Sequence, residues 1–187
     1  MIENIKVYQD VLSAATVSRI IRTANDKWHF KDSQVIVDGK SFVDKSQRNV
    51  QDYNLIPSNK NMTDTNIYNI VKKQIIKAVH KYKQECCPNL HLDNILEITC
   101  LKYDPGGKYD MHVDSSKHIP RELSVIIFLN DDYVGGDLEF FNSFGQSLLK
   151  VKPYPGSAII WPSNFMYPHR ANPILSGRRY VLVSWLN

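Results

Sequence analysis

The chain has 187 residues and a formal net charge of +4; 43% of its residues are hydrophobic and 22% are charged. This length and composition fit one ordinary globular domain and exclude a low-complexity or intrinsically disordered chain. The positive charge is too small and too dispersed to indicate a nucleic-acid partner by itself.

The sequence also gives expectations about the compartment. No run of residues is apolar enough to span a bilayer, and the first residues, MIENIK, do not resemble a signal peptide. The cysteines, Cys86, Cys87 and Cys100, have no spacing typical of a zinc site or a disulfide framework. We interpret them as reduced thiols that pack as small side chains, and we expect a cytoplasmic protein without a membrane partner.

The first half of the chain contains two predicted helices. One covers residues 10–25, with Ser13 as its N-cap and apolar residues on one face. The other begins near residues 63–65 and ends before Pro88. Residues 31–60 between them are polar and carry the turn signal Asp38-Gly39, which predicts a hairpin or a mobile loop.

From about residue 94 the pattern changes to short β-rich runs separated by glycine and proline. The predicted strands cover residues 95–103, 123–130, 137–141, 147–151, 157–161 and 178–186. Helices followed by closely spaced strands favour an α+β, mainly β fold, with the helices on one side of a β-sandwich or barrel. We predict a single domain over residues 1–187, with helical support from 1–93 and a β-rich core in 94–187.

His112 and Asp114 are candidate metal ligands, because side chains two residues apart project from the same face of a strand. Such a pair also occurs by chance, so a third ligand is required. His169 follows the predicted strand 157–161, and a closed sheet would return it toward the pair. Two histidines and one carboxylate form the facial arrangement that non-haem iron(II) uses, with coordination positions left open.

Arg179 lies on the last predicted strand, ten residues beyond His169. A guanidinium binds a carboxylate through two parallel hydrogen bonds and stays charged at every relevant pH. Arg179 is therefore the candidate anchor for the far end of a dicarboxylic cosubstrate. Its neighbour Arg178 points to the opposite face of the strand, and we expect that side chain to be solvated.

These residues lie within a pattern that resembles the prolyl-4-hydroxylase-type branch of the iron(II)/2-oxoglutarate dioxygenases. The matching segments keep the family's order and spacing over about the last half of the chain. They are YDPGGKYDMHVD (103–114), Arg121, IIFLN (126–130), GGDLEF (135–140), PYPGSAIIW (153–161), YPHRANP (167–173) and SGRRYVLVSW (176–185).

The resemblance implies a double-stranded β-helix, or jelly roll, with the N-terminal helices packed against one sheet. It implies that His112, Asp114 and His169 bind Fe(II). It also implies 2-oxoglutarate and O2 as cosubstrates, with ascorbate as the reductant.

The same resemblance places Arg179 and Tyr103 at the 2-oxoglutarate site. Some relatives carry a second tyrosine there, where this chain has Phe128. Phenylalanine donates no hydrogen bond, so Arg179 is expected to contribute more of the binding.

The expected reaction is hydroxylation of a protein or peptide, at proline, with succinate and CO2 as coproducts. Tyr109 and Trp185 are candidate walls of the substrate site, and core packing is the alternative interpretation of each side chain. His118 is expected to contact solvent or substrate. Residues 31–60 are a candidate lid over an extended peptide.

Other activities stay open at this stage. A nucleic-acid oxygenase would share the iron chemistry, but those relatives place another arginine late on the final strand, where this chain has VLVSW. Oxygenation of a free amino acid or another small molecule is a further alternative. A catalytically silent jelly-roll binding module is another, because fold alone does not determine function. A zinc hydrolase would have no need for Arg179.

Overall fold

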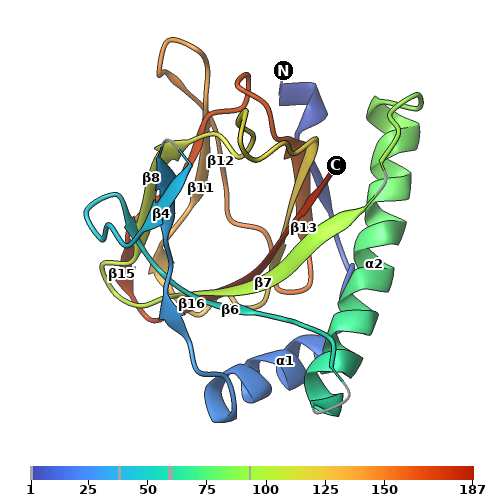
Figure 1. The fold of residues 1–187 in the computed structure, drawn as a ribbon, viewed down its shortest axis with the longest axis vertical. Coiled ribbons are helices and arrows are strands. Elements are labelled where there is room, and N and C mark those ends of the chain that lie inside the picture. The colour runs from blue at the N-terminus through green and yellow to red at the C-terminus, as the bar shows by residue number, and fades with distance from the viewer. Residues whose placement is uncertain (1, 38, 59–60, 93) are drawn as a thin grey trace.

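The computed structural model describes residues 2–37, 39–58, 61–92 and 94–187. Most strands belong to two antiparallel sheets, and the α-helices lie outside one of them (Figure 1). The larger sheet contains, in spatial order, β1 (Lys6–Tyr8), β13 (Ala158–Pro162), β9 (Leu123–Phe128), β16 (Arg179–Leu186), β7 (Ile95–Tyr103), β6 (Gln51–Asn54) and β2 (Lys31–Asp32). The smaller sheet contains β12 (Ser147–Val151), β11 (Leu138–Phe141), β14 (His169–Ala171), β8 (Lys108–His112) and β5 (Arg48–Asn49).

From β7 onward the chain crosses repeatedly between the two sheets. β7, β9, β13 and β16 belong to the larger sheet, and β8, β11 and β14 belong to the smaller one. This alternation is the double-stranded β-helix, and it confirms the predicted jelly roll. Two short pairs complete the strands: β10 (Val134–Gly135) with β15 (Ile174–Ser176), and β3 (Val35–Val37) with β4 (Lys40–Phe42).

The larger sheet is buried on both faces. On β9, Leu123, Val125 and Ile127 pack into the cluster that contains the helices. Ile126 and Phe128 point the opposite way, into the cluster between the sheets. The alternation follows from the two-residue period of a strand, and it explains why β9 reads as a continuous apolar run.

Both predicted helices are present. α1 (Ala14–Asp26) begins after Ser13, whose hydroxyl oxygen accepts a hydrogen bond from the Thr16 N–H at 3.3 Å. α2 (Met62–Cys86) begins at the edge of the predicted range. Among the described residues, no helix is long and apolar enough to cross a membrane.

The first turn of α2 is joined to the rest of the N-terminal half by Asp64. Its buried carboxylate accepts hydrogen bonds from Trp28 Nε1 at 2.9 Å, Tyr53 Oη at 2.6 Å and Asn61 Nδ2 at 2.7 Å. The rings of Trp28 and Tyr53 stack with their centroids 4.8 Å apart. This network holds β6, and with it one edge of the larger sheet, against the helix.

The N-terminal half also contributes strands to both sheets, beyond the helices predicted there. β5 pairs with β8 in the smaller sheet, and β6 pairs with β7 in the larger one. Within 31–60, the β3–β4 hairpin pairs Val35 with Phe42. Gly39 of the predicted turn signal lies between these two strands, whereas Asp38 is outside the described residues, as are Asn59 and Lys60.

Candidate active site

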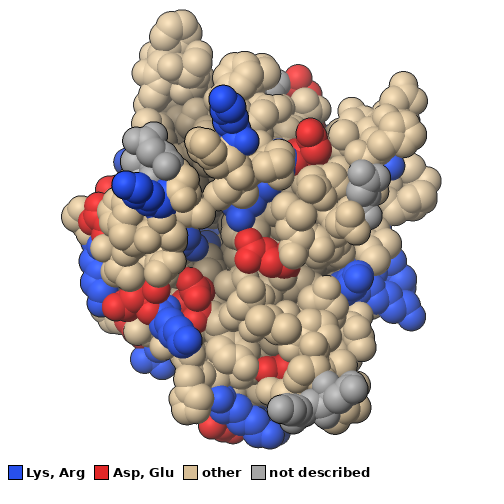
Figure 2. Space-filling model, viewed as in Figure 1, with Lys and Arg blue, Asp and Glu red and all other residues tan. Residues whose placement is uncertain are grey.

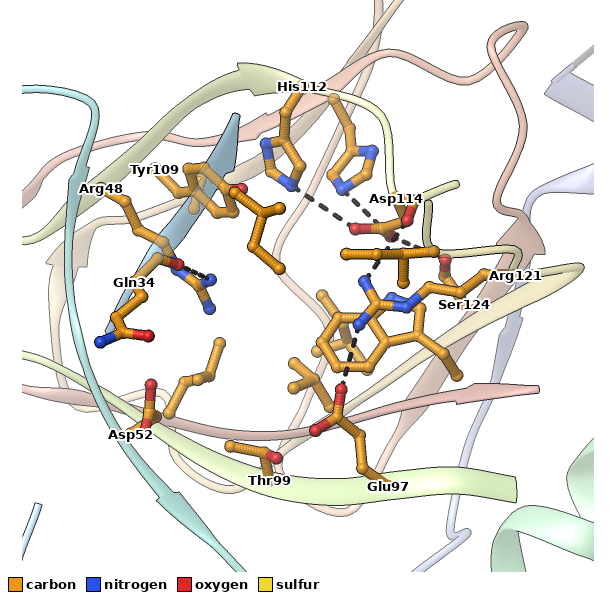
Figure 3. Close-up of a pocket in the computed structure, with 18 of the residues that line it drawn as sticks. Gln34, Arg48, Asp52, Glu97, Thr99, Tyr109, His112, Asp114, Arg121 and Ser124 are labelled. Carbon is orange, nitrogen blue, oxygen red and sulfur yellow. Dashed lines mark hydrogen bonds and ion pairs between the residues drawn. The ribbon is translucent and has the colours of Figure 1, made fainter. Parts of the chain in front are cut away.

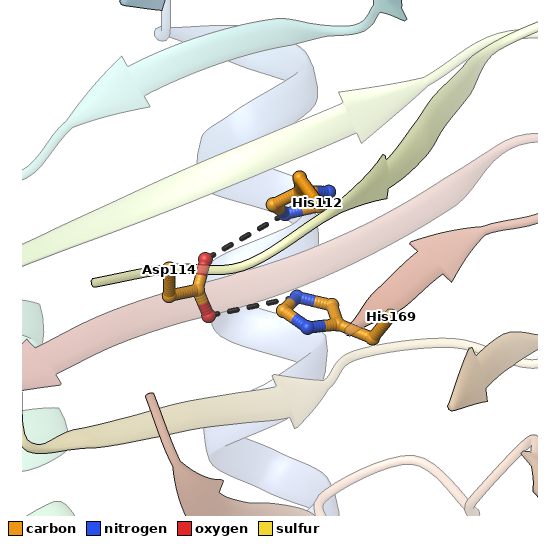
Figure 4. A group of neighbouring side chains, drawn as sticks. All are labelled: His112, Asp114 and His169. Carbon is orange, nitrogen blue, oxygen red and sulfur yellow. Dashed lines mark ion pairs between the residues drawn. The ribbon is translucent and has the colours of Figure 1, made fainter. Parts of the chain in front are cut away.

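The pairing of β8 with β14 brings the three predicted metal ligands together. His112 is the last residue of β8, and its register partner on β14 is His169. His112 Nε2 lies 3.6 Å from Asp114 Oδ1, and His169 Nε2 lies 3.5 Å from Asp114 Oδ2 (Figure 4). One donor atom from each residue falls within 4.8 Å of the other two.

The expectation that His112 and Asp114 share one strand is wrong. β8 ends at His112, and Asp114 lies in the bend that follows. The chain leaves the sheet there, and its next backbone hydrogen bond joins the N–H of Ser115 to the carbonyl of Ser163 at 3.0 Å. The side chains still converge because the bend turns the carboxylate toward the two imidazoles.

The imidazoles are oriented by their own backbone. Nδ1 of His112 lies 2.8 Å from the Asp110 carbonyl oxygen, and Nδ1 of His169 lies 3.0 Å from the Tyr167 carbonyl oxygen. Each Nδ1–H therefore donates to a carbonyl, which leaves the Nε2 lone pairs directed at the site. This arrangement is typical of histidines that bind metals.

The protonation states also suit a divalent cation. Burial lowers the pKa of His169 to about 4, although the nearby Asp114 opposes the shift. Burial by itself would raise the pKa of Asp114, but the two imidazoles and the Ser124 hydroxyl outweigh it and hold that pKa below its usual range. Near neutral pH the site presents a neutral imidazole and a carboxylate, which fit Fe(II).

The triad lies on the wall of a cavity of about 540 Å³ between the two sheets (Figure 3). The inner faces of β7 and β16 form much of the opposite wall, and Arg179 and Tyr103 lie there side by side as register partners. Both predicted cosubstrate residues therefore line the same cavity as the metal ligands.

Arg179 is almost fully buried, with 1% of its surface exposed. Its Nη1 donates to the carbonyl of Gly136 at 2.7 Å, and its guanidinium carbon lies 4.8 Å from the centre of the Tyr103 ring. Within the described part of the chain, its Nε has no hydrogen-bond partner and the guanidinium forms no ion pair with a carboxylate. A buried cation with spare donors fits one carboxylate of a dicarboxylic ligand.

Phe128 and Arg178, the two neighbours of Arg179 considered in the sequence, both lie outside the cavity wall. Phe128 is fully buried 5.4 Å from the guanidinium carbon and is not part of the cavity wall. Arg178 projects outward, is half-exposed and pairs with Asp104 at 2.5 Å.

Tyr109 lies between the metal site and the N-terminal half. Its ring stacks on His112 with the centroids 3.5 Å apart, and the guanidinium carbon of Arg48 lies 4.7 Å from the Tyr109 ring centre. Arg48 in turn donates to the carbonyl of Gln34, beside the β3–β4 hairpin, at 2.8 Å. Tyr109 thus lines the cavity and links the hairpin to His112, a candidate metal ligand.

Trp185 also lines the cavity, where the guanidinium carbon of Arg121 lies 3.6 Å from its ring centre. Arg121 donates to Glu97 Oε1 at 3.0 Å and to the carbonyl of Asp114 at 3.3 Å. Sequence reasoning assigned no role to Glu97, although its even spacing from Tyr103 along β7 places both on one face. His118 is exposed and outside the cavity wall.

A jelly roll that gathers two histidines and an aspartate beside a buried arginine defines the class of non-haem iron oxygenases. The family model for the 2OG-Fe(II) oxygenase superfamily matches residues 98–187. This match, together with the PKHD-type relatives and the prolyl-4-hydroxylase structures described below, supports a prolyl-4-hydroxylase-type 2OG-Fe(II) oxygenase.

Among curated proteins, the chain is 36% identical over 94 residues to a PKHD-type hydroxylase of Psychrobacter sp. (strain PRwf-1), a match covering 45% of this chain and 35% of that protein. It is 28% identical over 189 residues to a PKHD-type hydroxylase of Synechococcus sp. (strain JA-2-3B'a(2-13)), covering 95% of this chain and 75% of that protein. The first matches thus span less than half the length of those relatives.

Two solved structures share the fold. A Pseudomonas putida prolyl-4-hydroxylase superposes with a TM-score of 0.72 at 19% identity, covering 99% of this chain and 92% of that chain. A Trichoplax adhaerens prolyl hydroxylase, solved with a hypoxia inducible factor peptide fragment, superposes with a TM-score of 0.77 at 15% identity, covering 98% and 83%.

Proposed function

We propose that this protein is an Fe(II)- and 2-oxoglutarate-dependent dioxygenase that hydroxylates a protein or peptide, with proline as the first candidate residue. One observation carries the proposal. The His112, Asp114 and His169 donors and the spare donors of Arg179 line one cavity. A metal site and a separate buried cation in one chamber match a ligand that chelates the metal and extends a carboxylate away from it.

In this proposal each group on the cavity wall has a defined task. The triad holds Fe(II), Arg179 binds the distal carboxylate of 2-oxoglutarate, and the Tyr103 hydroxyl assists it. When bound, the metal and 2-oxoglutarate supply the O2-dependent oxidation of a C–H bond, with succinate and CO2 as coproducts and ascorbate as reductant. The protein contributes fixed ligands, an anchoring charge and a cavity shielded from water.

The mouth of the cavity suits a polypeptide. Ile36 of the β3–β4 hairpin and its register partner Ser41 line the cavity, and Ile36 is 50% exposed. We propose that residues 31–60 close over the substrate, and that Tyr109 and Trp185 form the walls that contact it.

The names of the similar proteins support a peptide substrate, because one solved structure was obtained with a peptide fragment and several are prolyl hydroxylases. The charge distribution does not favour nucleic acid. Figure 2 shows Lys and Arg interspersed with Asp and Glu on the face viewed, without a large area of one sign. A backbone-binding groove for nucleic acid is expected to be positive.

We further propose a reducing, cytoplasmic location. Cys86, Cys87 and Cys100 are all free thiols, and Cys100 is buried in the core away from solvent. Their arrangement supports a compartment in which disulfides do not form.

The test is conversion of 2-oxoglutarate to succinate by the purified protein with Fe(II), ascorbate and O2. Proline-containing peptides, free amino acids and methylated single-stranded DNA are supplied in separate reactions, and products are identified by mass spectrometry. We expect peptide-stimulated turnover and addition of one oxygen atom to proline, both lost in Asp114→Ala and Arg179→Leu. Absence of Fe(II) and 2-oxoglutarate binding would overturn the proposal in favour of a silent scaffold.

A further inference from the structure

Two buried serines stand behind the carboxylate of the candidate metal site. Ser124 lies on β9 and Ser163 directly follows β13, and each has 1% of its surface exposed. The Ser124 hydroxyl donates to Asp114 Oδ2 at 2.7 Å (Figure 3), and the two serine Oγ atoms lie 2.7 Å apart.

The direction of these hydrogen bonds follows from the donors available. An ionised carboxylate only accepts hydrogen bonds, so the single hydroxyl proton of Ser124 points to Asp114 Oδ2. Ser163 must then donate its proton to the Ser124 oxygen. The two bonds form a directed chain from Ser163 through Ser124 to Oδ2.

The two carboxylate oxygens of Asp114 therefore differ. Among the described residues, Ser124 is the side chain that donates a hydrogen bond to this carboxylate, and it does so at Oδ2. Each oxygen faces one imidazole, Oδ1 at 3.6 Å from Nε2 of His112 and Oδ2 at 3.5 Å from Nε2 of His169, so the serine hydrogen bond is what distinguishes them and leaves Oδ1 available as a ligand atom.

The backbone holds the serine pair in place. The Ser163 carbonyl accepts the N–H of Ser115, the residue after Asp114, at 3.0 Å, and the Ser163 N–H donates to the Glu122 carbonyl at 2.9 Å. Ser163 is thus tied both to the ligand-bearing bend and to the entrance of β9. A shift of the bend would break the side-chain and backbone contacts together.

We propose that Ser124, supported by Ser163, is a positioning residue that occupies Asp114 Oδ2 and presents Oδ1 as the single carboxylate ligand of the metal. The inference rests on the proposed metal-binding function. A carboxylate with both oxygens free is able to bind one ion with both, which would use a position that the cosubstrate or O2 requires. Hydrogen bonds to ligating carboxylates are a known means of orienting them.

The test compares Ser124→Val with Ser124→Thr. Both replacements are β-branched and similar in size and suit a strand, but threonine alone keeps the hydroxyl. Co(II) is titrated into the metal-free protein, and its visible absorption reports both the dissociation constant and the coordination. We expect Ser124→Val to weaken Co(II) binding about 10- to 100-fold and to alter the spectrum, while Ser124→Thr stays near wild type.

Ser163→Ala tests the contribution of the second serine. It removes the hydrogen bond from Ser163 to Ser124 and leaves the hydrogen bond from Ser124 to Asp114 in place. We expect a weaker effect, of about threefold, and no further loss when Ser163→Ala is added to Ser124→Val, since Ser163 acts through Ser124. Ser184→Ala is the matched control: Ser184 is equally buried and donates to the carbonyl of Glu97 at 2.7 Å. Removal of the Ser184 hydroxyl should lower the free energy of unfolding and leave the Co(II) dissociation constant and absorption spectrum unchanged.

A wild-type Co(II) constant and spectrum in Ser124→Val would overturn the inference while leaving the proposed function intact. If Ser124→Val does not fold, Ser163→Ala decides, and unchanged binding there would also overturn it. If the wild-type protein itself binds no Co(II) and no Fe(II), the proposed function fails and this inference fails with it.

Discussion

The guanidinium carbon of Arg121 lies 3.6 Å from the centre of the Trp185 ring, at the side of the cavity away from Arg179. The same guanidinium donates to Glu97 and to the backbone of Asp114. Trp185 is therefore held between β7, which carries Glu97, and the bend that carries the candidate metal ligand Asp114. Its orientation is fixed before any substrate arrives, which favours a role in placing the substrate.

We expect Trp185→Leu to raise the KM for a peptide substrate about tenfold. The change removes part of an aromatic surface, and a loss of about 1.4 kcal/mol corresponds to that factor. Steady-state succinate formation at varied peptide concentration measures it. The dissociation constant of 2-oxoglutarate should stay at the wild-type value, and an unchanged KM would show that Trp185 only packs in the core.

Arg179→Leu should raise the dissociation constant of 2-oxoglutarate about 10- to 100-fold. A hydrogen bond to a charged group contributes about 1.5–3 kcal/mol, and leucine donates none. Anaerobic calorimetry of the metal-loaded protein measures the constant. Arg178→Leu is the matched control, because that neighbour pairs with Asp104 at the surface and should leave cosubstrate binding unchanged. Equal effects of the two changes would contradict the assignment.

The metal-free protein should lose stability as the pH falls from about 6.5 to about 4. Burial holds the pKa of His169 at about 4, so the unfolded chain takes up a proton on this histidine at a higher pH than the folded protein does. The free energy of unfolding therefore falls with decreasing pH in this window, by up to about 3 kcal/mol, and this group contributes no pH dependence above it.

Urea unfolding at about pH 7.5 and about pH 5 checks this expectation in the wild type and in His169→Gln. The wild type should lose more stability between the two conditions than the variant does. The lowered pKa of Asp114 affects stability only at lower pH, because its contribution is lost below the ordinary aspartate value of about 3.9. Identical losses in the two proteins would mean that His169 does not titrate as its burial indicates.

Asp64→Ala should reduce the free energy of unfolding by about 3 kcal/mol without changing 2-oxoglutarate binding. The change leaves Trp28 Nε1 and the Tyr53 hydroxyl without their acceptor, and each unpaired buried donor costs about 1–3 kcal/mol. Chemical denaturation measures the loss. A changed cosubstrate affinity would indicate that the helix contacts reach the site.

Much of the fold follows from local sequence pattern. The long apolar strands such as β7 and β9, and both helices with the Ser13 cap, carry periodic signals that survive without tertiary context. The short strands β2, β5 and β6 carry none, because two to four polar residues have no measurable period. They become strands because a neighbouring strand offers its edge: β6 pairs with the long β7, β5 with β8, and β2 with β6.

Some features of the candidate site follow from the sequence, and others depend on the fold. The spacing of His112 and Asp114 and the position of Arg179 are visible in the sequence, but the pairing of His112 with His169 is a property of the closed sheets. Ser124 was not identifiable, because one serine in an apolar strand has no signal that points to Asp114. Its role depends on a contact across 10 residues of chain that only the fold creates.

β16 carries Arg179 at its start and Trp185 near its end, and both line the cavity, as does Val183 between them. The strand spans roughly 20 Å between these two side chains, at about 3.3 Å per residue. The strand therefore fixes the distance between Arg179, the proposed anchor for the cosubstrate, and Trp185, the proposed wall of the substrate site. One residue inserted between Arg179 and Trp185 would turn one of the two side chains out of the cavity. The length of this segment is therefore fixed by the need to keep both side chains on the cavity face.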